Sequence, residues 1–335
     1  MHPERTSRMK RKVTRMELRF SKYHGAGNDF ILFRQEDLLD LPLAVLARAV
    51  CHRHYGIGAD GIMVASPSQV ADIKMTIINA DGSLAEMCGN GIRCFSRYVH
   101  EEGLIEKTTF SVETDAGILA ADIVKVDRAE YAVRISMGKP NDDPQAIPMD
   151  PTVDPWNYAI ELMEGEGVLA FTCSSLRMGV PHTMVWDVRY MDGELGAEAE
   201  GQNVEPSEEG PELKVSLDFM QEDLPQQFGM IIEHAGIFPH RTNVNFVKVL
   251  SDDRLQVNTW ERGAGETLAC GTGACASAFA AQIKGLVGRD VVVEVPGGSL
   301  RIEIQEDHEI FMTGPAALVS KGNFYFPAKE APQSV

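Results

Sequence analysis

The sequence predicts a mixed α/β (α+β) chain built from two related domains. The chain has 335 residues, about the length of two ordinary domains. Strand-like runs separated by Gly, Pro, Asn and Asp alternate with a few helix-like segments. The pattern Cys-Gly-x-Gly occurs twice, at Cys88 and at Cys270, each time between a glutamate-bearing loop and a helix-like segment. A duplicated domain with one thiol in each half is the simplest explanation.

The first half is expected to contain several strands and two helices. Both ends of 17–35 have strand patterns, with a tight polar loop between them, and Pro42 favours a helix start. The turn residues 138–141 mark the expected domain boundary. Strands are expected at 61–65, 72–78, 108–114, 117–125 and 130–137, and helices at 42–53 and at 89–102, the latter entered through a glycine-rich run.

The second half is expected to repeat this arrangement around an acidic segment. Residues 187–227 carry twelve acidic and two basic side chains, so this segment is expected to contain a surface loop. A glycine-rich loop at 263–273 precedes an expected helix of small residues at 274–285. Strands are expected at 168–174, 182–187, 244–250, 255–260, 291–295, 299–304 and 309–313.

Composition and charge exclude several classes of function. Acidic residues outnumber basic ones by 49 to 31, giving a net charge of −18. Because affinity for phosphates comes from clustered Lys and Arg, we expect neither nucleic-acid binding nor attachment to an anionic membrane. No run of about 18 apolar residues that could span a membrane is present.

Residues 1–15 differ from the rest of the chain. They carry six basic side chains and one acidic side chain, and they lack the apolar core of a secretory signal. We expect a disordered, dispensable basic leader, with Met16 as an alternative start. Without an export signal, a cytoplasmic location and reduced thiols are expected for the six cysteines.

The two repeated cysteines are candidates for acid–base chemistry. Each is expected where a loop enters a helix, where unpaired backbone N–H groups carry partial positive charge. This environment is expected to lower the pKa of Cys88 and of Cys270, and the same N–H groups could hold a carboxylate. Two such thiols on opposite faces of one carbon atom would invert its configuration, because one accepts a proton while the other donates one.

Other kinds of site fit these residues less well. The pairs Cys88/Cys94 and Cys270/Cys275 could supply metal ligands, but their spacings are wider than those of the usual zinc sites, so no metal is expected. The stretch 56–61, Gly-Ile-Gly-Ala-Asp-Gly, matches the dinucleotide pattern without the required strand and helix around it. A thiol-redox or metal-binding protein remains an alternative.

Four motifs resemble those of the diaminopimelate epimerases, which interconvert LL- and meso-diaminopimelate without a cofactor. The motifs lie within a region of resemblance from Met16 to about Tyr325. Asn90 favours this family over the proline racemases, which share the fold but carry His at that place. The motifs are His-Gly-Ala-Gly-Asn-Asp-Phe at 24–30, Asn-Ala-Asp-Gly-Ser-Leu-Ala-Glu-Met-Cys-Gly-Asn-Gly-Ile-Arg-Cys at 79–94, Arg-Thr-Asn-Val-Asn-Phe at 241–246, and Glu-Arg-Gly-Ala-Gly-Glu-Thr-Leu-Ala-Cys-Gly-Thr-Gly-Ala-Cys at 261–275.

The resemblance implies two pseudo-symmetric domains, each a curved, mostly antiparallel sheet wrapped around a central helix, with the active site in the cleft between them. It implies that the last strand returns to the first domain. That domain would then comprise 16–139 plus 314–330, and the second would comprise 140–313 with the acidic insertion around 187–227. It also implies an amino-acid substrate, no cofactor, a homodimer, and a place in lysine and peptidoglycan precursor synthesis.

The resemblance also assigns roles to individual residues. In the family, the cysteines that match Cys88 and Cys270 are the acid–base thiols, and the residues that match His182 and Glu261 lie beside the reacting centre. The expected substrate contacts are the backbone around Gly89, Asn90, Gly271 and Thr272 for the reacting carboxylate, and the side chains of Asn28, Asn79, Asn243 and Arg262 for the amino groups and the distal carboxylate.

One departure from the family bears on the choice of substrate. The usual Gly-Asn-Pro-His is Gly-Val-Pro-His at 179–182 in this chain, and Val180 cannot hydrogen-bond through its side chain. This leaves a related cofactor-independent racemase of another amino acid, such as histidine, as an alternative. The retained Asn79, Asn243 and Arg262 favour diaminopimelate, because they match the set that recognises its second amino-acid end.

Overall fold

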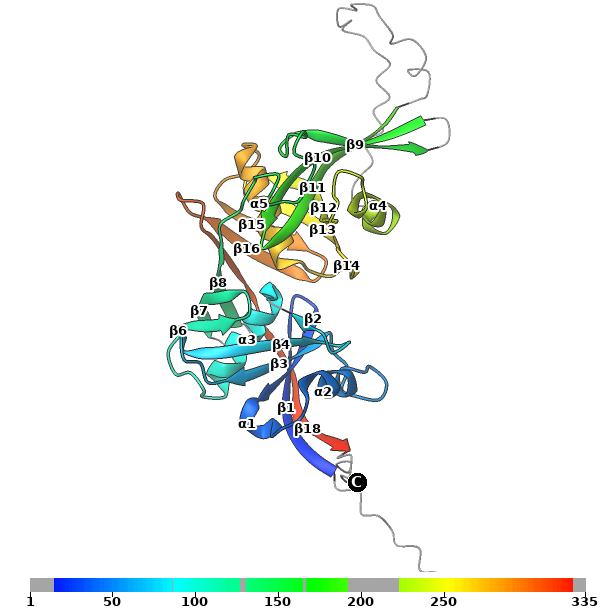
Figure 1. Ribbon diagram of the computed structural model, residues 1–335. Coiled ribbons are helices and arrows are strands. Elements are labelled where there is room, and N and C mark those ends of the chain that lie inside the picture. The colour runs from blue at the N-terminus through cyan, green and yellow to red at the C-terminus, as the bar shows by residue number, and fades with distance from the viewer. Residues whose placement is uncertain (1–14, 86, 127–130, 165–166, 192–222, 328–335) are drawn as a thin grey trace, which may run out of the picture.

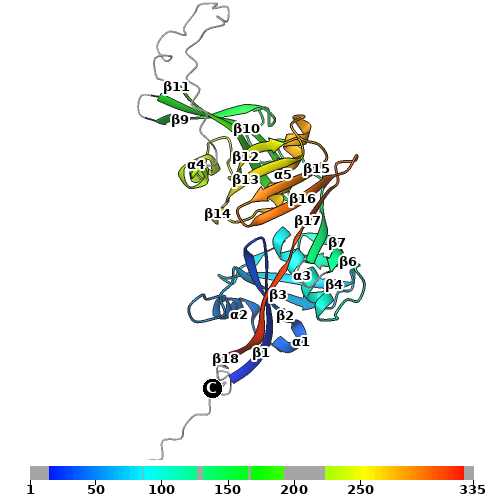
Figure 2. The same ribbon diagram turned by 180° about the vertical axis from the view of Figure 1, so that it is seen from behind.

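The computed structural model describes residues 15–85, 87–126, 131–164, 167–191 and 223–327. Its helices and strands form two bodies, one above the other in Figure 1 and again in the view from behind in Figure 2. The lower body holds the first-half elements together with the last strand, and the upper body holds the second-half elements. Residues 1–14 of the expected leader and residues 192–222 of the acidic segment lie outside the described residues, whereas Arg15 already belongs to the first strand.

The first half contains eight strands and three helices among the described residues. Its long helix, α3, begins directly after Cys88. The strands are β1 Arg15–Gly25, β2 Asn28–Arg34, β3 Gly61–Ser66, β4 Ile73–Asn79, β5 Leu84–Ala85, β6 Thr109–Thr114, β7 Gly117–Val126 and β8 Tyr131–Gly138, and the helices are α1 Gln35–Leu38, α2 Leu43–Val50 and α3 Gly89–Glu101.

The second half contains the remaining described elements. Its long helix, α5, begins directly after Cys270. The strands are β9 Tyr158–Glu164, β10 Gly167–Met178, β11 Val180–Met191, β12 Asn243–Ser251, β13 Arg254–Glu261, β14 Gly265–Thr267, β15 Asp290–Val295, β16 Gly298–Ile304, β17 Ile310–Pro315 and β18 Ala317–Pro327, and the helices are α4 Leu224–Glu233 and α5 Gly271–Ile283.

The two halves have the same strand topology. The first-half strands pair in the order β1, β2, β3, β4, β6, β7 and β8, and of these pairs only β2/β3 and β4/β6 are parallel. The second-half strands pair in the corresponding order β10, β11, β12, β13, β15, β16 and β17, and of these pairs only β11/β12 and β13/β15 are parallel. The helices α2 and α4 bridge the first parallel pair of each half, and α3 and α5 bridge the second. This confirms the predicted pair of pseudo-symmetric α/β units.

Two strand pairings join the halves. Strand β8 pairs antiparallel with β17, so the two sheets form one continuous hydrogen-bonded ladder. Strand β18 follows β17 directly but pairs antiparallel with β1, and Figure 1 shows it beside β1 in the lower body. The return of the last strand to the first half supports the division into 16–139 with 314–330 and 140–313, which we propose as the domain boundaries.

Each long helix lies against the strands of its own half. Helix α3 contacts β1, β2, β3, β7 and β8, and α5 contacts β10 to β13 and β15 to β17. Helix α5 is buried on nearly every side from Gly271 to Ala281. Because strands surround it, little space remains for its side chains, and this explains why most of them are small. Helix α3 is anchored in the hydrophobic core by the fully buried side chains of Ile92, Phe95 and Val99.

The structure differs from the predicted elements mainly at the acidic segment. Residues 187–191 belong to β11 and residues 224–233 form α4, so the two ends of the acidic segment are regular structure, while the predicted surface loop falls within residues 192–222, outside the described residues. Helix α4 forms because its apolar residues Leu224 and Ile232 are buried against second-half residues such as Phe171 and Phe246. Helix α5 begins three residues before the predicted 274–285, because its first turn consists of the glycine-rich residues themselves. Strands β9, β5 and β14 and helix α1 were not predicted.

Candidate active site

Cys88 and Cys270 occupy the same position in the two halves. Each is the N-cap residue of the long helix of its half, with an extended backbone. The Gly91 backbone N–H donates to Cys88 Sγ at 3.4 Å. Cys270 Sγ lies 3.5 Å from Thr272 Oγ1. Both thiols therefore lie among the unpaired N–H groups of a helix start, as the sequence predicts.

The two helix starts meet each other. A β-carbon placed on Gly89 would lie 3.6 Å from the Cα atom of Gly271, and both glycines face the terminal methyl group of Met312. Asn90 Nδ2 donates to the Ala269 carbonyl at 2.9 Å and so links the halves directly. The N-terminal ends of α3 and α5, each with a partial positive charge, thus point at a common region.

A buried cation locks this junction. Arg93 is fully buried, and its guanidinium donates to the carbonyl of Gly89 at 3.0 Å, to Asn90 Oδ1 at 2.9 Å and to the Pro315 carbonyl at 3.3 Å. Burial lowers the pKa of Arg93 from its ordinary value. The Asn90 side chain is thereby committed to holding the two halves together, so only the backbone of Asn90 can serve a substrate.

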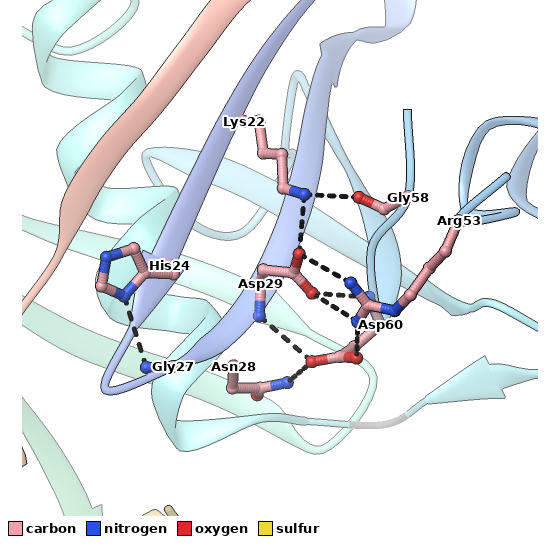
Figure 3. A network of polar contacts seen from close by, with 8 residues as sticks. All are labelled: Lys22, His24, Gly27, Asn28, Asp29, Arg53, Gly58 and Asp60. Atoms are coloured by element: carbon pink, nitrogen blue, oxygen red, sulfur yellow. Dashed lines mark hydrogen bonds and ion pairs between the residues drawn. The ribbon is translucent and has the colours of Figure 1, made fainter. Parts of the chain in front are cut away.

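Asn28 is the neighbour of Cys88, and a network of charged residues holds its side chain (Figure 3). Asn28 Nδ2 donates to Asp60 Oδ2 at 2.7 Å, and Cys88 Sγ donates to Asn28 Oδ1 at 3.4 Å. Asp60 also accepts from the Arg53 guanidinium at 2.8 Å, and Arg53 pairs with Asp29 at 3.1 Å. A carboxylate only accepts hydrogen bonds, so Asp60 fixes the amide of Asn28 with its oxygen toward the thiol.

Cys270 has a different partner, Glu261. The Glu261 carboxylate lies near enough to the Cys270 thiol for its charge to raise the pKa of that thiol, and Thr267 Oγ1 donates to the same carboxylate at 2.7 Å. Burial raises the pKa of Glu261, which makes this carboxylate a better proton acceptor near neutral pH. The thiol of the second half therefore lies beside a group that can take its proton, whereas Cys88 lies beside an amide.

The expected lowering of both thiol pKa values is wrong in this structure. Burial raises the pKa of Cys88, and the hydrogen bond from Gly91 offsets this only in part. Burial and the nearby charge of Glu261 raise the pKa of Cys270 well above its ordinary value. The loss of solvation of a thiolate outweighs the helix start here, because both helix ends lie in the interior. Both residues are therefore thiols in this structure.

His182 lies on β11 beneath the second helix start. It is fully buried, and burial together with the nearby Arg262 lowers its pKa to about 3. Its Nδ1 atom lies 3.2 Å from Asn245 Nδ2. Its Nε2 atom is buried and has no hydrogen-bond partner among the described residues. An imidazole in this environment is neutral at physiological pH.

Asn243 and Arg262 are brought together on adjacent strand ends. Asn243 Oδ1 accepts from the Arg262 backbone N–H at 2.7 Å. The Arg262 side chain is exposed and donates to the His240 carbonyl at 2.9 Å, and it forms no ion pair within the described part of the chain. An exposed guanidinium of this kind can accept a carboxylate in a bidentate manner. Arg262 fits its expected role better than Asn243, whose amide oxygen is occupied.

Two further residues bear on substrate recognition. Asn79 is exposed, and its side chain donates to Ser83 Oγ at 3.0 Å within a turn. The structure therefore does not join the Asn79 side chain to the thiols. Val180 is 37% exposed and begins β11. The turn before it reaches the second helix start, since a β-carbon on Gly179 would lie 3.9 Å from Thr272.

Several residues that organise the site were missed by sequence reasoning. Asp60 belongs to the Gly-Ile-Gly-Ala-Asp-Gly stretch, which signals a tight turn as well as a rejected dinucleotide motif. Arg93 and Asn245 lie inside the quoted motifs but received no role. Their signal was the presence of polar residues within apolar or small-residue runs, which marks a buried hydrogen-bond network.

Two general findings concern metals and membranes. Within the described ranges, no group of three or more His, Cys, Asp and Glu side chains is placed to hold a metal ion. None of the helices that the structure describes is long and apolar enough to cross a membrane.

Sequence comparison identifies a family and close relatives. The family described as diaminopimelate epimerase matches residues 20–142 and 211–319. A diaminopimelate epimerase of Alkaliphilus metalliredigens is 40% identical over 308 residues, which are 92% of this chain and 97% of that protein. A diaminopimelate epimerase of Moorella thermoacetica is 42% identical over 310 residues, which are 92% and 99% of the two chains.

Solved structures show the same fold at low sequence identity. A hydroxyproline epimerase from Agrobacterium vitis is 15% identical with a TM-score of 0.60, covering 93% of this chain and 94% of that one. A probable proline racemase from Agrobacterium radiobacter is 17% identical with a TM-score of 0.58, covering 91% and 92%. At these identities the likeness concerns the fold alone.

Proposed function

Because the chain belongs to the diaminopimelate epimerase family, we propose that it interconverts LL-2,6-diaminopimelate and meso-diaminopimelate by proton transfer between Cys88, Cys270 and the substrate's α-carbon. The observation that carries this proposal is the meeting of two thiol-capped helix starts at Gly89 and Gly271. An amino-acid carboxylate at this junction would place its α-carbon between the two thiols.

The proposed reaction needs one base and one acid on opposite faces of the α-carbon. One thiolate takes the α-proton, and the other thiol delivers its proton to the opposite face, so the configuration inverts and the charges are exchanged. The backbone N–H groups of Gly89, Asn90, Gly271 and Thr272 would stabilise the negative charge that spreads onto the carboxylate. No cofactor takes part in this scheme.

Glu261 gives the second thiol a route to its thiolate form. Its carboxylate lies near Cys270 and acts on that thiol electrostatically, and burial raises the pKa of Glu261. We infer that Glu261 takes the thiol proton when Cys270 acts as the base. Arg262 is placed to bind the distal carboxylate of the substrate, and Asn28 to accept a hydrogen bond from an amino group next to Cys88.

The test follows the α-proton by NMR in deuterated water, with reduced protein and no added cofactor. We expect LL-diaminopimelate to lose its α-proton and to yield the meso product. If neither diaminopimelate nor any of a panel of amino acids exchanges its α-proton, the proposal is wrong. Activity that requires added pyridoxal phosphate would contradict the cofactor-free scheme.

Val180 favours a second candidate, a racemase of another amino acid such as histidine. Its side chain is partly exposed and cannot donate to the distal end of diaminopimelate, and the preceding Gly179 lies beside the second helix start. Exchange with L-histidine but not with diaminopimelate would support this candidate. Under the main proposal, Val180→Asn lowers KM for diaminopimelate with little change in kcat, because the new amide would contact only the distal end.

We further propose a cytoplasmic location and a homodimer, as the family resemblance implies. Sedimentation velocity of the full chain tests the second statement. A species of one 36.8 kDa chain across the concentration range would contradict it.

A further inference from the structure

The repeated topology supplies an internal comparison for the residues under each helix start. In the first half, the parallel pairing of β2 and β3 begins with Phe30 opposite Gly61. In the second half, the parallel pairing of β11 and β12 begins with His182 opposite Asn243. Phe30 and His182 are therefore counterparts.

The same register makes Met63 and Asn245 counterparts. Met63 is two residues after Gly61, and Asn245 is two residues after Asn243. A second observation agrees, because each of these side chains fills the space beside a glycine of a first helical turn. A β-carbon on Gly91 would lie 2.0 Å from Met63 Cε, and one on Gly273 would lie 2.3 Å from Asn245 Oδ1.

The two halves fill this space with opposite chemistry. Phe30 and Met63 are buried in the apolar core of the first half, whereas His182 and Asn245 are both fully buried polar residues. Burying polar side chains is costly unless they are hydrogen-bonded. Since an apolar pair supports the same turn in the first half, the fold itself does not require the polar pair in the second half.

The hydrogen bonds of Asn245 determine where the His182 proton lies. Asn245 Nδ2 donates to the Thr183 carbonyl at 3.2 Å, and Asn245 Oδ1 accepts from Thr259 Oγ1 at 3.0 Å. A carbonyl only accepts, so this nitrogen is fixed next to His182 Nδ1, 3.2 Å away. His182 Nδ1 must then accept, and the proton of the neutral ring lies on Nε2.

We propose that Asn245 is a positioning residue that holds His182 as the neutral Nε2–H tautomer, so that His182 acts as a hydrogen-bond donor to a substrate carboxylate and not as a proton acceptor. His182 Nε2 is buried with no partner among the described residues, which leaves this donor for a ligand. The nearby Arg262 acts electrostatically on His182 and attracts the same anion. The identity of the substrate rests on the proposed function, but the tautomer does not.

Nitrogen NMR of the full chain tests the tautomer without any substrate. In protein with ¹⁵N-labelled histidine, two-bond proton–nitrogen correlations distinguish Nε2–H, Nδ1–H and doubly protonated rings, and His182→Gln identifies the signals. We expect the Nε2–H pattern in the wild type, and in Asn245→Asp a change to a ring protonated at Nδ1, because a carboxylate accepts there. A wild-type ring protonated at Nδ1, or an unchanged pattern in Asn245→Asp, would overturn the proposal.

Replacing His182 and Asn245 by the residue types of their first-half counterparts tests whether His182 acts as a hydrogen-bond donor in catalysis. The double variant His182→Phe/Asn245→Met copies the first half, so we expect it to fold with an unchanged or raised Tm while kcat falls by about 100-fold or more. Asn258→Met, which makes the same change as Asn245→Met on the neighbouring strand β13, is the matched control and should keep kcat. An active double variant would overturn the donor role. The wild-type spectrum, with His182→Gln for the assignment, decides the tautomer even if Asn245→Asp and the double variant fail to fold, and it does so separately from the assay with diaminopimelate.

Discussion

Gly89 and Gly271 lie so close that a β-carbon on Gly89 would be 3.6 Å from the Cα atom of its counterpart. The same β-carbon would meet Met312 Cε at 3.2 Å, and so would one on Gly271. Neither glycine has a positive φ, so the requirement for glycine here is space and not backbone conformation. The region where the helix starts meet therefore depends on the absence of side chains at these two positions.

Replacing either glycine should impair activity more than stability. We expect Gly89→Ala and Gly271→Ala each to lower kcat by about 100-fold, because a shift of roughly 1 Å in the helix starts misplaces the reacting groups. Gly236→Ala is the control, since a β-carbon there meets no atom within 4 Å. The α-proton exchange assay and thermal unfolding measure both effects. Equal activity in Gly89→Ala and Gly236→Ala would contradict the proposed carboxylate position.

Removing either thiol should abolish epimerisation and leave the fold intact. In Cys88→Ala and Cys270→Ala we expect turnover to fall by about 1,000-fold or more, because each direction needs both an acid and a base. Cys173→Ala removes a fully buried thiol that packs with Phe171 and Val185 in the second half and should keep turnover despite some loss of stability. Circular dichroism and formation of the meso product provide the readout. Near-normal turnover in either single variant would refute the two-base scheme.

The sequence predicted the parts of the site that are local in the chain. The Cys-Gly-x-Gly pattern was sufficient to place both thiols at helix starts, because capping and glycine tolerance are local properties. It also predicted the duplication, although only three residues of a four-residue pattern are identical in the two halves. The strand register that makes His182 the counterpart of Phe30 is visible only in the structure, because these strands share no sequence pattern.

Other features could not be predicted because they depend on burial and on long-range contacts. The direction of the thiol pKa shifts was wrong, since local reasoning counts the helix N–H groups but not the loss of solvation around Cys270. The role of Arg93 depends on the Pro315 carbonyl, which lies 222 residues away in the chain. Helix α4 was missed because its apolar residues follow an acidic segment.

Asp60 should control Cys88 through the Asn28 amide. In Asp60→Ala the amide is free to turn its NH₂ group toward a thiolate, so we expect the pH midpoint of Cys88 alkylation to fall by about one unit. The measurement uses iodoacetamide in a Cys270→Ser background. Asp290→Ala, which only breaks a surface pair with Arg301, should leave the midpoint unchanged.

The variant Asp60→Asn distinguishes two effects of Asp60 on Cys88: the orientation of the Asn28 amide and the negative charge of the Asp60 carboxylate. Its amide oxygen can still accept from Asn28 Nδ2, while its negative charge is gone. We expect the Cys88 midpoint of Asp60→Asn to stay near that of the wild type. If Asp60→Asn shifts the midpoint as far as Asp60→Ala does, the charge of Asp60 acts on Cys88 directly and the positioning role is wrong.

His182 should make the protein less stable in mild acid. Its pKa is about 3 in the folded state against 6.5 ordinarily, so between these values the unfolded chain binds a proton that the folded chain does not. The free energy of unfolding therefore falls as the pH drops below the ordinary value, by about 2 kcal/mol between pH 7 and pH 5 from this residue alone. Urea unfolding at pH 7 and at pH 5 measures this fall in the free energy of unfolding. In His182→Gln the fall should be about 2 kcal/mol smaller than in the wild type. The control is His54→Gln, at an exposed position, whose free energy of unfolding should fall as much as that of the wild type. If the free energy of unfolding of His182→Gln also falls as much as that of the wild type, His182 is not buried as a neutral ring.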